Sequence, residues 1–355
     1  MTALTRILAQ RIAAAGPLSI ADYMAECLLH PDHGYYTTRE PFGTTGDFTT
    51  APEISQMFGE LLGLCLAQAW LDQQAPTPFA LAELGPGRGT LMADILRATR
   101  GIPGFRDALQ LHLVEASGTL RARQKATLAG HHVIWHDEVT TLPDLPLFLI
   151  ANEFFDALPI RQFLRQGSGW AERQVGWREG RLAFGLAQPA PQPALDHRLA
   201  DTAEGDMVEH CPGAAPIVTQ IAARIARRGG AAIVVDYGDW RSSGDSLQAL
   251  RRHQRDDPLA HPGEADITAH VDFEALALAA APSCRVSAMV AQGALLERLG
   301  ISARTRTLAA GLRGAALQSH LAAHRRLTHP EEMGNLFKAI ALGPKGSPLP
   351  PGFTE

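Results

Sequence analysis

A regular alternation of short apolar runs with helical segments, beginning after Pro78, is the feature that most constrains the fold. The pattern predicts strands and intervening helices in turn at residues 79–84, 90–99, 109–115, 118–128, 133–136 and 147–151. Strands that alternate with helices at this spacing form βαβ units, whose parallel sheet is covered on both faces. The chain is therefore expected to be an α/β protein with a Rossmann-like, mostly parallel sheet.

The rest of the chain is expected to elaborate that sheet. Helical patterns precede it, with one helix ending at Gly16, one capped by Ser19 and one running from Pro52 through Trp70. Between the last two helices, residues 30–50 are expected to form an irregular loop able to fold over a ligand as a lid. The later segments are a β meander at 161–186, a helix at 217–226, a strand at 231–236, a polar loop at 241–262, helices at 272–280, 294–299 and 308–327, and a strand at 336–342.

Four regions follow from these patterns. They are an N-terminal helical and lid region (1–75), the first half of the sheet (76–160), an insertion (161–215), and the second half with helical elaborations (216–345).

The sharpest local signal is the sequence ELGPGRGT at residues 83–90, between the first strand and the first helix of the sheet. Glycines at 85, 87 and 89 allow a tight turn and close approach of a ligand to the backbone, and the helix start offers unpaired N–H groups. The spacing lacks the G-x-G-x-x-G of dinucleotide sites and the Gly-Lys-Ser/Thr of a P-loop. It predicts a nucleotide-like ligand without a triphosphate.

Acidic residues at the strand ends narrow the choice of ligand. Glu83 precedes the first glycine, where a carboxylate would repel a pyrophosphate and suit a cationic ligand. Glu115 ends the second strand, in position to accept both ribose hydroxyls, and Asp137 follows the third, where it could meet an adenine amino group. Together these residues favour S-adenosylmethionine over NAD.

A second polar segment, ANEFFDALP at residues 151–159, follows the most apolar strand. The carboxyl ends of strands in open α/β sheets face the ligand crevice. Asn152, Glu153 and Asp156, beside Phe154 and Phe155, could hold a polar planar group against an apolar wall. The alternative interpretation is a helix start with capping acids.

Composition excludes several classes of function. The 37 acidic and 32 basic residues give a net charge of −5, which provides no field for nucleic acid. The four cysteines and fourteen histidines show no metal-ligand spacing, so no metal is expected. No run approaches the roughly 18 apolar residues that span a bilayer, so no membrane insertion is expected and a cytoplasmic location is favoured.

These motifs resemble the family of S-adenosylmethionine-dependent methyltransferases that includes mitochondrial complex I assembly factors and their bacterial relatives, also called the MidA family. The resemblance is spread over most of the chain, at residues 16–20, 30–36, 46–55, 83–90, 152–159, 236–238, 266–273 and 292–293.

The resemblance implies a class I methyltransferase fold with a seven-stranded sheet, a helical N-terminal elaboration and an inserted β meander. The implied cofactor is S-adenosyl-L-methionine. The residues expected to bind it are Glu83, Gly85, Pro86, Gly87, Gly89, Glu115, Asp137 and Asn152.

The mitochondrial members of the family resemble protein arginine methyltransferases acting on a subunit of respiratory complex I (NADH dehydrogenase). A guanidinium acceptor requires carboxylates that orient it. The candidates for catalysis are Glu153, Asp156, Asp236, Asp47 and His270. The location implied is the bacterial cytoplasm, or the mitochondrial matrix in a eukaryote.

Three other functions stay open from sequence alone. The chain could methylate a small molecule or another protein side chain, or act as a noncatalytic assembly chaperone that keeps the cofactor fold. A dehydrogenase is the remaining alternative.

Overall fold

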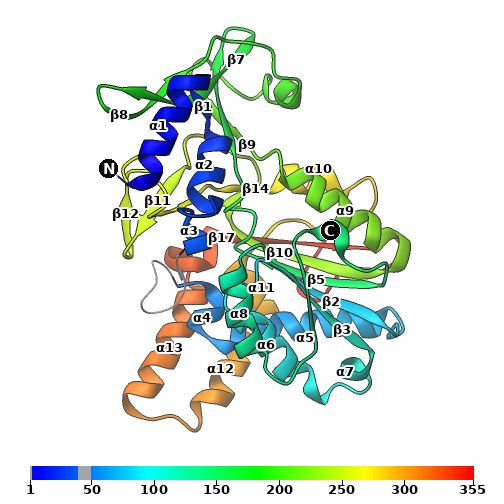
Figure 1. Ribbon diagram of the computed structural model, residues 1–355. Coiled ribbons are helices and arrows are strands. Elements are labelled where there is room, and N and C mark those ends of the chain that lie inside the picture. Colours follow the sequence, from blue (N-terminus) through cyan, green and yellow to red (C-terminus); the bar gives the residue numbers. More distant parts are fainter. Residues whose placement is uncertain (1, 39–48) are drawn as a thin grey trace. The chain divides into compact units, whose positions relative to one another are not determined.

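The computed structural model describes residues 2–38 and 49–355, which group into two compact units (Figure 1). The larger one, called here the sheet unit, comprises Thr49–Phe155, Ala215–Gly238 and Phe273–Glu355. The other, the insertion unit, comprises Met1–Phe48, Asp156–Ala214 and Asp239–Asp272. The N-terminal helices thus belong with the insertion, while residues 49–75 belong with the sheet.

A mostly parallel sheet organises the sheet unit, as the sequence predicts. Its strand order is β4-β3-β2-β5-β10-β17-β15; β17 runs antiparallel to both of its neighbours, and the pairs from β4 through β10 are parallel. The bounds are β2 Phe79–Leu84, β3 Leu109–Val114, β4 Val133–His136, β5 Leu147–Asn152, β10 Gly230–Asp239, β15 Arg285–Val286 and β17 Phe337–Gly343, with β16 (Val290–Ala291) also paired to β17.

The strand order has a switch point between β2 and β5. From β2 the chain continues outward through β3 and β4, whereas β5 and β10 lie on the other side of β2. In open α/β sheets, ligands bind outside the carboxyl ends of the strands at such a point. The glycine loop follows β2 and the ANEFFDALP segment follows β5, so the fold brings the two motifs to this position.

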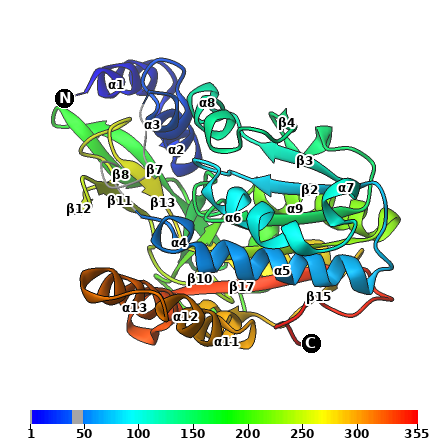
Figure 2. The ribbon, with the colours of Figure 1, turned by 90° about the horizontal axis from the view of Figure 1, so that it is seen from below.

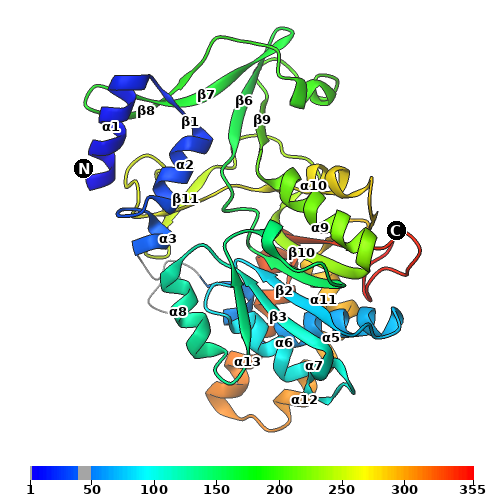
Figure 3. The same ribbon diagram turned by 45° about the vertical axis from the view of Figure 1, so that its right-hand side comes forward.

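Helices cover both faces of this sheet. Figures 1 and 3 both show α9 (Ala214–Arg228) and α10 (Phe273–Ala280) on the opposite side from α5 (Gln56–Asp72) and α6 (Thr90–Ala98). Figure 2 shows α5 running beside the sheet, with other helices gathered near β17. The remaining helices of the unit are α4 Ala51–Ile54, α7 Phe105–Ala108, α8 Gly118–Thr127, α11 Gln292–Arg298, α12 Ile301–Ala309 and α13 Gly314–Thr328.

The insertion unit is built on antiparallel strands. Its larger sheet has the order β1-β7-β6-β9, with β8 paired to β7, and a smaller one has the order β12-β11-β13. The strands are β1 Leu18–Ser19, β6 Arg161–Gln166, β7 Gly169–Arg178, β8 Arg181–Leu186, β9 Met207–His210, β11 Gln248–Arg251, β12 Gln254–Asp256, β13 Asp266–Thr268 and β14 Val271–Asp272. The helices α1 (Ala3–Ala15), α2 (Ile20–Leu29) and α3 (Tyr35–Thr38) complete it.

One hydrophobic core explains why the N-terminal helices join the insertion. Leu8 of α1 and Tyr23 of α2 are fully buried in the same cluster as Val175 of β7 and Ile267 of β13. Segments that are distant in sequence therefore bury their apolar faces together.

Two expected loops contain regular structure. The segment 241–262 carries the β11–β12 hairpin, whose turn residues Arg252 and His253 both have positive φ (54° and 62°). Such turns usually carry Asn or Gly, so Arg252 and His253 give no local signal of a hairpin. The described part of the loop at 30–50 holds the short helix α3.

Two expected helices are each divided into two. Ser55 separates α4 from α5 because its extended backbone interrupts the helix, and its hydroxyl caps α5 by accepting a hydrogen bond from Met57 N at 3.2 Å. The helix expected at 308–327 is instead α12 and α13, separated by a segment that contains Gly311. Glycine favours such breaks because it loses more entropy than other residues in a helix.

An aromatic cluster gives a direct test of this core. Phe79 is fully buried, and its ring lies 5.0 Å from Phe105, 5.4 Å from Phe148 and 5.6 Å from Trp70 between centroids. Phe79→Ala should lower the free energy of unfolding by about 3–5 kcal/mol through the cavity it leaves, measured by urea denaturation. Leu278→Ala, at a site 60% exposed, is the control and should change it by about 0.5 kcal/mol or less. Equal effects of the two substitutions would contradict the described packing.

Candidate functional site

The glycine loop has the backbone conformation that its sequence requires. Gly85, Gly87 and Gly89 have φ angles of 57°, 52° and 81°, all in the left-handed region that favours glycine. Gly89 N donates to Pro86 O at 2.7 Å, which closes the turn, and α6 begins directly after Gly89. The loop thus presents a helix N-terminus beside the carboxyl end of β2.

Side chains from neighbouring elements pack on this loop. A Cβ atom on Gly85 would lie 2.9 Å from Phe154 Cδ2, so a side chain there would displace the Phe154 ring. Glu53 of α4 accepts hydrogen bonds from Thr90 Oγ1 at 2.5 Å and from Arg88 Nη1 at 3.5 Å. The loop is therefore anchored on one side by α4 and on the other by the segment after β5.

Two buried carboxylates lie at the ends of β2 and β3. Glu83 is 3% exposed and Glu115 is 8% exposed. Burial and, after it, repulsion by the Glu115 carboxylate raise the pKa of Glu83 to about 8. Glu83 Oε2 accepts no hydrogen bond from the described residues. A buried acid in this state can be stabilised in its charged form by a cation placed beside it.

Glu115 is held by a set of donors. Its Oε1 accepts from Ser117 N at 2.8 Å and its Oε2 from Gln124 Nε2 at 3.0 Å. Burial raises the pKa of Glu115, while these donors oppose the rise. The carboxylate is therefore fixed in orientation at the end of β3.

Asp137 differs from the other two acids. Its side chain is 85% exposed and forms an ion pair with Arg121, whose Nη2 lies 2.6 Å from Asp137 Oδ1. The same guanidinium donates through Nε to Glu115 O at 2.8 Å. Asp137 follows β4, as expected. Its side chain is exposed, unlike those of Glu83 and Glu115. Its contact with a cofactor stays a prediction.

A strained turn follows β5. Glu153 has a φ of 50°, a conformation that costs a residue with a side chain free energy and persists only where the surroundings enforce it. The enforcing group is Asp236, whose Oδ2 accepts from Phe154 N at 3.1 Å and from Phe155 N at 3.0 Å. Asp236 is fully buried, and its contacts with these two backbone N–H groups hold the turn in position.

The turn places an amide and a carboxylate side by side. Glu153 Oε1 accepts from Asn152 Nδ2 and from Ala51 N, both at 3.2 Å. Asn152 is 7% exposed, and its Oδ1 accepts no hydrogen bond from the described residues. Asn152, Glu153 and Asp236 thus form one connected group beside the glycine loop.

The remaining expected catalytic residues are Asp156, His270 and Asp47. Asp156 and His270 belong to the insertion unit, where Asp156 is 5% exposed and accepts from Ala269 N at 3.0 Å through its carbonyl oxygen. His270 is exposed, and its backbone N donates to Ser246 Oγ at 2.8 Å. Asp47 lies outside the described residues, as do residues 39–48 of the expected lid as a whole.

Sequence reasoning missed two residues of this region. Gln124 is fully buried although it lies in a polar helix, and its spacing from the buried Leu120 and Leu128 was a readable signal of an inward-facing amide. Glu53 lies in the resembling stretch 46–55 and at the start of an expected helix, but no local pattern points to its contact with Thr90.

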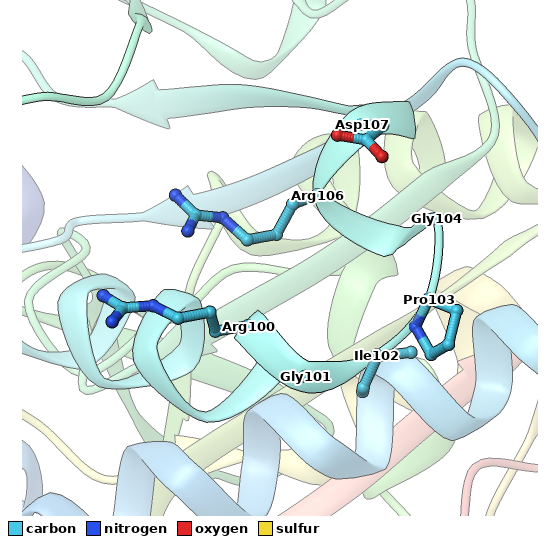
Figure 4. A pocket seen from close by; sticks show the side chains of 7 residues that line it. All are labelled: Arg100, Gly101, Ile102, Pro103, Gly104, Arg106 and Asp107. Carbon is cyan, nitrogen blue, oxygen red and sulfur yellow. The ribbon is translucent and has the colours of Figure 1, made fainter.

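A separate open pocket of about 500 Å³ lies in the segment that leads into β3 (Figure 4). It is lined by Arg100, Gly101, Ile102, Pro103, Gly104, Arg106 and Asp107. This segment precedes β3, so the pocket is at the amino end of the strand, whereas the glycine loop and Glu115 are at carboxyl ends. None of the expected site residues line it.

Two negative findings concern the same described residues. Across residues 2–38 and 49–355, no group of three or more His, Cys, Asp or Glu side chains is arranged to hold a metal ion. The helices of this part of the chain include none with the length and apolar character needed to cross a bilayer.

The strand order, the glycine loop after β2 and the acid after β3 define a class I S-adenosylmethionine-dependent methyltransferase. A family model described as S-adenosyl-L-methionine-dependent methyltransferase matches residues 61–291. A crystal structure of a Burkholderia thailandensis protein bound to S-adenosyl-homocysteine is 31% identical, with a TM-score of 0.81, covering 96% of this chain and 92% of that one.

Curated relatives match nearly the whole length of the chain. The rat protein named "Protein arginine methyltransferase NDUFAF7, mitochondrial" is 36% identical over 97% of this chain and 85% of its own. The human protein of the same name is 35% identical, over 97% and 84%. The chain belongs to this family of S-adenosyl-L-methionine-dependent methyltransferases, and it is an enzyme that uses S-adenosyl-L-methionine.

The residues present fit that cofactor. Its sulfonium and amino groups are cationic, and the site holds two buried acids together with two buried oxygens, on Glu83 and Asn152, that accept nothing from the described residues. These acidic and acceptor groups can stabilise a positively charged ligand directly.

The raised pKa of Glu83 predicts that cofactor binding depends on pH. Near pH 7 the unliganded carboxyl is mostly protonated, and a cationic ligand favours its charged form, so binding should release a proton. Affinity for S-adenosylmethionine should therefore increase as pH rises toward about 8, by up to about tenfold per pH unit, measured by calorimetry.

Glu83→Gln is the control, because the amide cannot ionise and should remove this dependence. Protonation changes of S-adenosylmethionine itself affect binding to both proteins equally, so they cancel in the comparison. Identical pH profiles for wild type and Glu83→Gln would contradict the assignment.

Proposed function

We propose that this methyltransferase transfers a methyl group to the guanidinium of an arginine in a protein substrate. The observation that carries the proposal is the Glu153 carboxylate, held in a strained turn at the carboxyl end of β5 beside the glycine loop. The names of the mitochondrial relatives, protein arginine methyltransferases, give independent support. The resemblance of the sequence to complex I assembly factors suggests a subunit of the respiratory NADH dehydrogenase as the substrate.

We propose that Glu83, the backbone of residues 85–89, Glu115 and Asn152 bind the cofactor. S-adenosylmethionine, when bound, supplies an activated methyl group. Glu115 suits the ribose hydroxyls because its donors fix the carboxylate while leaving lone pairs on both oxygens.

Glu153 would orient the acceptor. A carboxylate can accept two parallel hydrogen bonds from a guanidinium. These bonds would fix the plane of the guanidinium and direct one of its nitrogens toward the methyl group. It can also take up the proton that this nitrogen loses when the N–C bond forms. Phe154, packed against Gly85, would keep water from the reacting nitrogen.

The remaining candidates have other parts in this proposal. Asp236 holds the Glu153 turn through the backbone of Phe154 and Phe155. Asp156, His270 and Asp47 remain candidates for contact with the acceptor protein. We expect the enzyme to act where its substrate is assembled, in the bacterial cytoplasm or, in a eukaryote, the mitochondrial matrix.

Glu153→Gln tests the acceptor site. The amide keeps an oxygen that can accept from Ala51 N, so the fold and cofactor affinity should persist while methyl transfer falls by about a hundredfold or more. The assay incubates the protein with labelled S-adenosylmethionine and lysate from cells that lack it, followed by mass spectrometry of the labelled residue.

Glu138→Gln, a change to an exposed carboxylate of the same unit, is the matched control and should leave transfer unchanged. Label on arginine that depends on Glu153 supports the proposal. Label on another residue or on a small molecule would contradict the arginine assignment, and cofactor binding without any label would indicate a noncatalytic chaperone.

A further inference from the structure

Gln124 of α8 lies at the centre of the cofactor site without facing the solvent. Its side chain is fully buried, in a helix whose only other buried residue is Leu120. Nothing in the chemistry proposed above uses it. A buried amide costs free energy unless its donors and acceptor are all hydrogen-bonded. The hydrogen-bond partners of Gln124 therefore indicate its role.

Three partners occupy both ends of the amide. Nε2 donates to Gly87 O at 2.9 Å and to Glu115 Oε2 at 3.0 Å, while Oε1 accepts from Trp135 Nε1 at 2.9 Å. The orientation of the amide is set by these partners, because an indole N–H only donates, whereas a carbonyl and a carboxylate only accept. Each N–H of the amide thus has a different acceptor.

Those two acceptors belong to the two halves of the cofactor site. Gly87 is the middle glycine of the loop after β2, and Glu115 is the acid after β3. The loop also packs on the same side chain, since a Cβ atom on Gly89 would lie 3.6 Å from Gln124 Cγ. One amide therefore ties the position of the loop to the orientation of the Glu115 carboxylate.

We propose that Gln124 is a positioning residue for the cofactor: it aligns the glycine loop with the Glu115 carboxylate before the cofactor binds. Trp135 of β4 holds the amide in the orientation that makes this possible. The inference rests on the proposed placement of the cofactor at Glu115 and the loop, and it is independent of which acceptor is methylated.

A double-mutant cycle measured as binding of S-adenosylhomocysteine tests this proposal. Gln124→Leu should weaken binding by about tenfold to a hundredfold, because a hydrogen bond to a charged group is lost. In a Glu115→Gln background the same change should cost about fivefold or less, the remainder coming from the neutral bond to Gly87 O. Trp135→Phe keeps both hydrogen bonds that Gln124 Nε2 donates, so it should have a smaller effect than Gln124→Leu.

Gln124→Glu keeps the size of the side chain and replaces its donors with acceptors, so it should reproduce the loss if Gln124→Leu fails to fold. Melting temperatures of all variants separate binding from stability. An equal loss in both backgrounds, or undiminished binding by both Gln124→Leu and Gln124→Glu, would overturn the proposal. If Glu115→Gln itself binds as tightly as wild type, the placement of the cofactor is wrong instead. The assay involves no methyl acceptor, so failure of the arginine proposal would leave it unchanged.

Discussion

The burial of two neighbouring carboxylates, Glu83 and Glu115, is the constraint on which the proposed cofactor site depends. Glu83 lies opposite Leu113 in the parallel register of β2 and β3, and Glu115 follows two residues later on the same face, so the two acids lie near each other. Burial and, after it, repulsion by Glu115 raise the pKa of Glu83 to about 8, so near neutral pH a proton on Glu83 is favoured when no cation is beside it. In the proposed site a cationic cofactor would make the same pair favourable, which would give S-adenosylmethionine an advantage over ligands that carry phosphates.

The surrounding elements keep this unfavourable pair in place. Gln124 donates to Glu115, Asp236 fixes the turn after β5 by accepting from two backbone N–H groups, and Glu53 connects α4 to the glycine loop. All of these contacts are made by buried or half-buried side chains from segments far apart in sequence. The site is therefore preorganised by the packing of the sheet unit, and its polar groups need little rearrangement when the cofactor binds.

Local patterns were sufficient to predict the parallel strands of the sheet and the place of the glycine loop at its carboxyl edge. The apolar run at 79–84 and the ELGPGRGT sequence together define a strand, a turn and a helix, and Glu115 followed from its place at the next strand end. Asp236 could be named as an acid at a strand end, but its positioning of Phe154 and Phe155 could not, because those residues are about 80 positions away in the sequence. Gln124 was hidden for a similar reason, since its acceptors are brought to it only by the fold.

The departures from expectation have equally local causes. A positive φ at Arg252 and His253 makes a hairpin turn without the usual Asn or Gly, and Ser55 interrupts a helix that its apolar spacing would otherwise continue. The grouping of the N-terminal helices with the insertion reflects a shared core, which no local pattern encodes. Helical spacing alone could not show which apolar face each helix would cover.

The most direct test of this account is a crystal structure of the protein with S-adenosylhomocysteine. The account predicts the ligand at the carboxyl ends of β2 and β3, with its ribose hydroxyls within hydrogen-bond distance of Glu115, its methionine part beside Glu83, and Gln124 still bonded to Gly87 and Glu115. A ligand bound elsewhere, for example in the pocket at Arg100 and Arg106, or one that leaves Glu83 and Glu115 without contact, would contradict it.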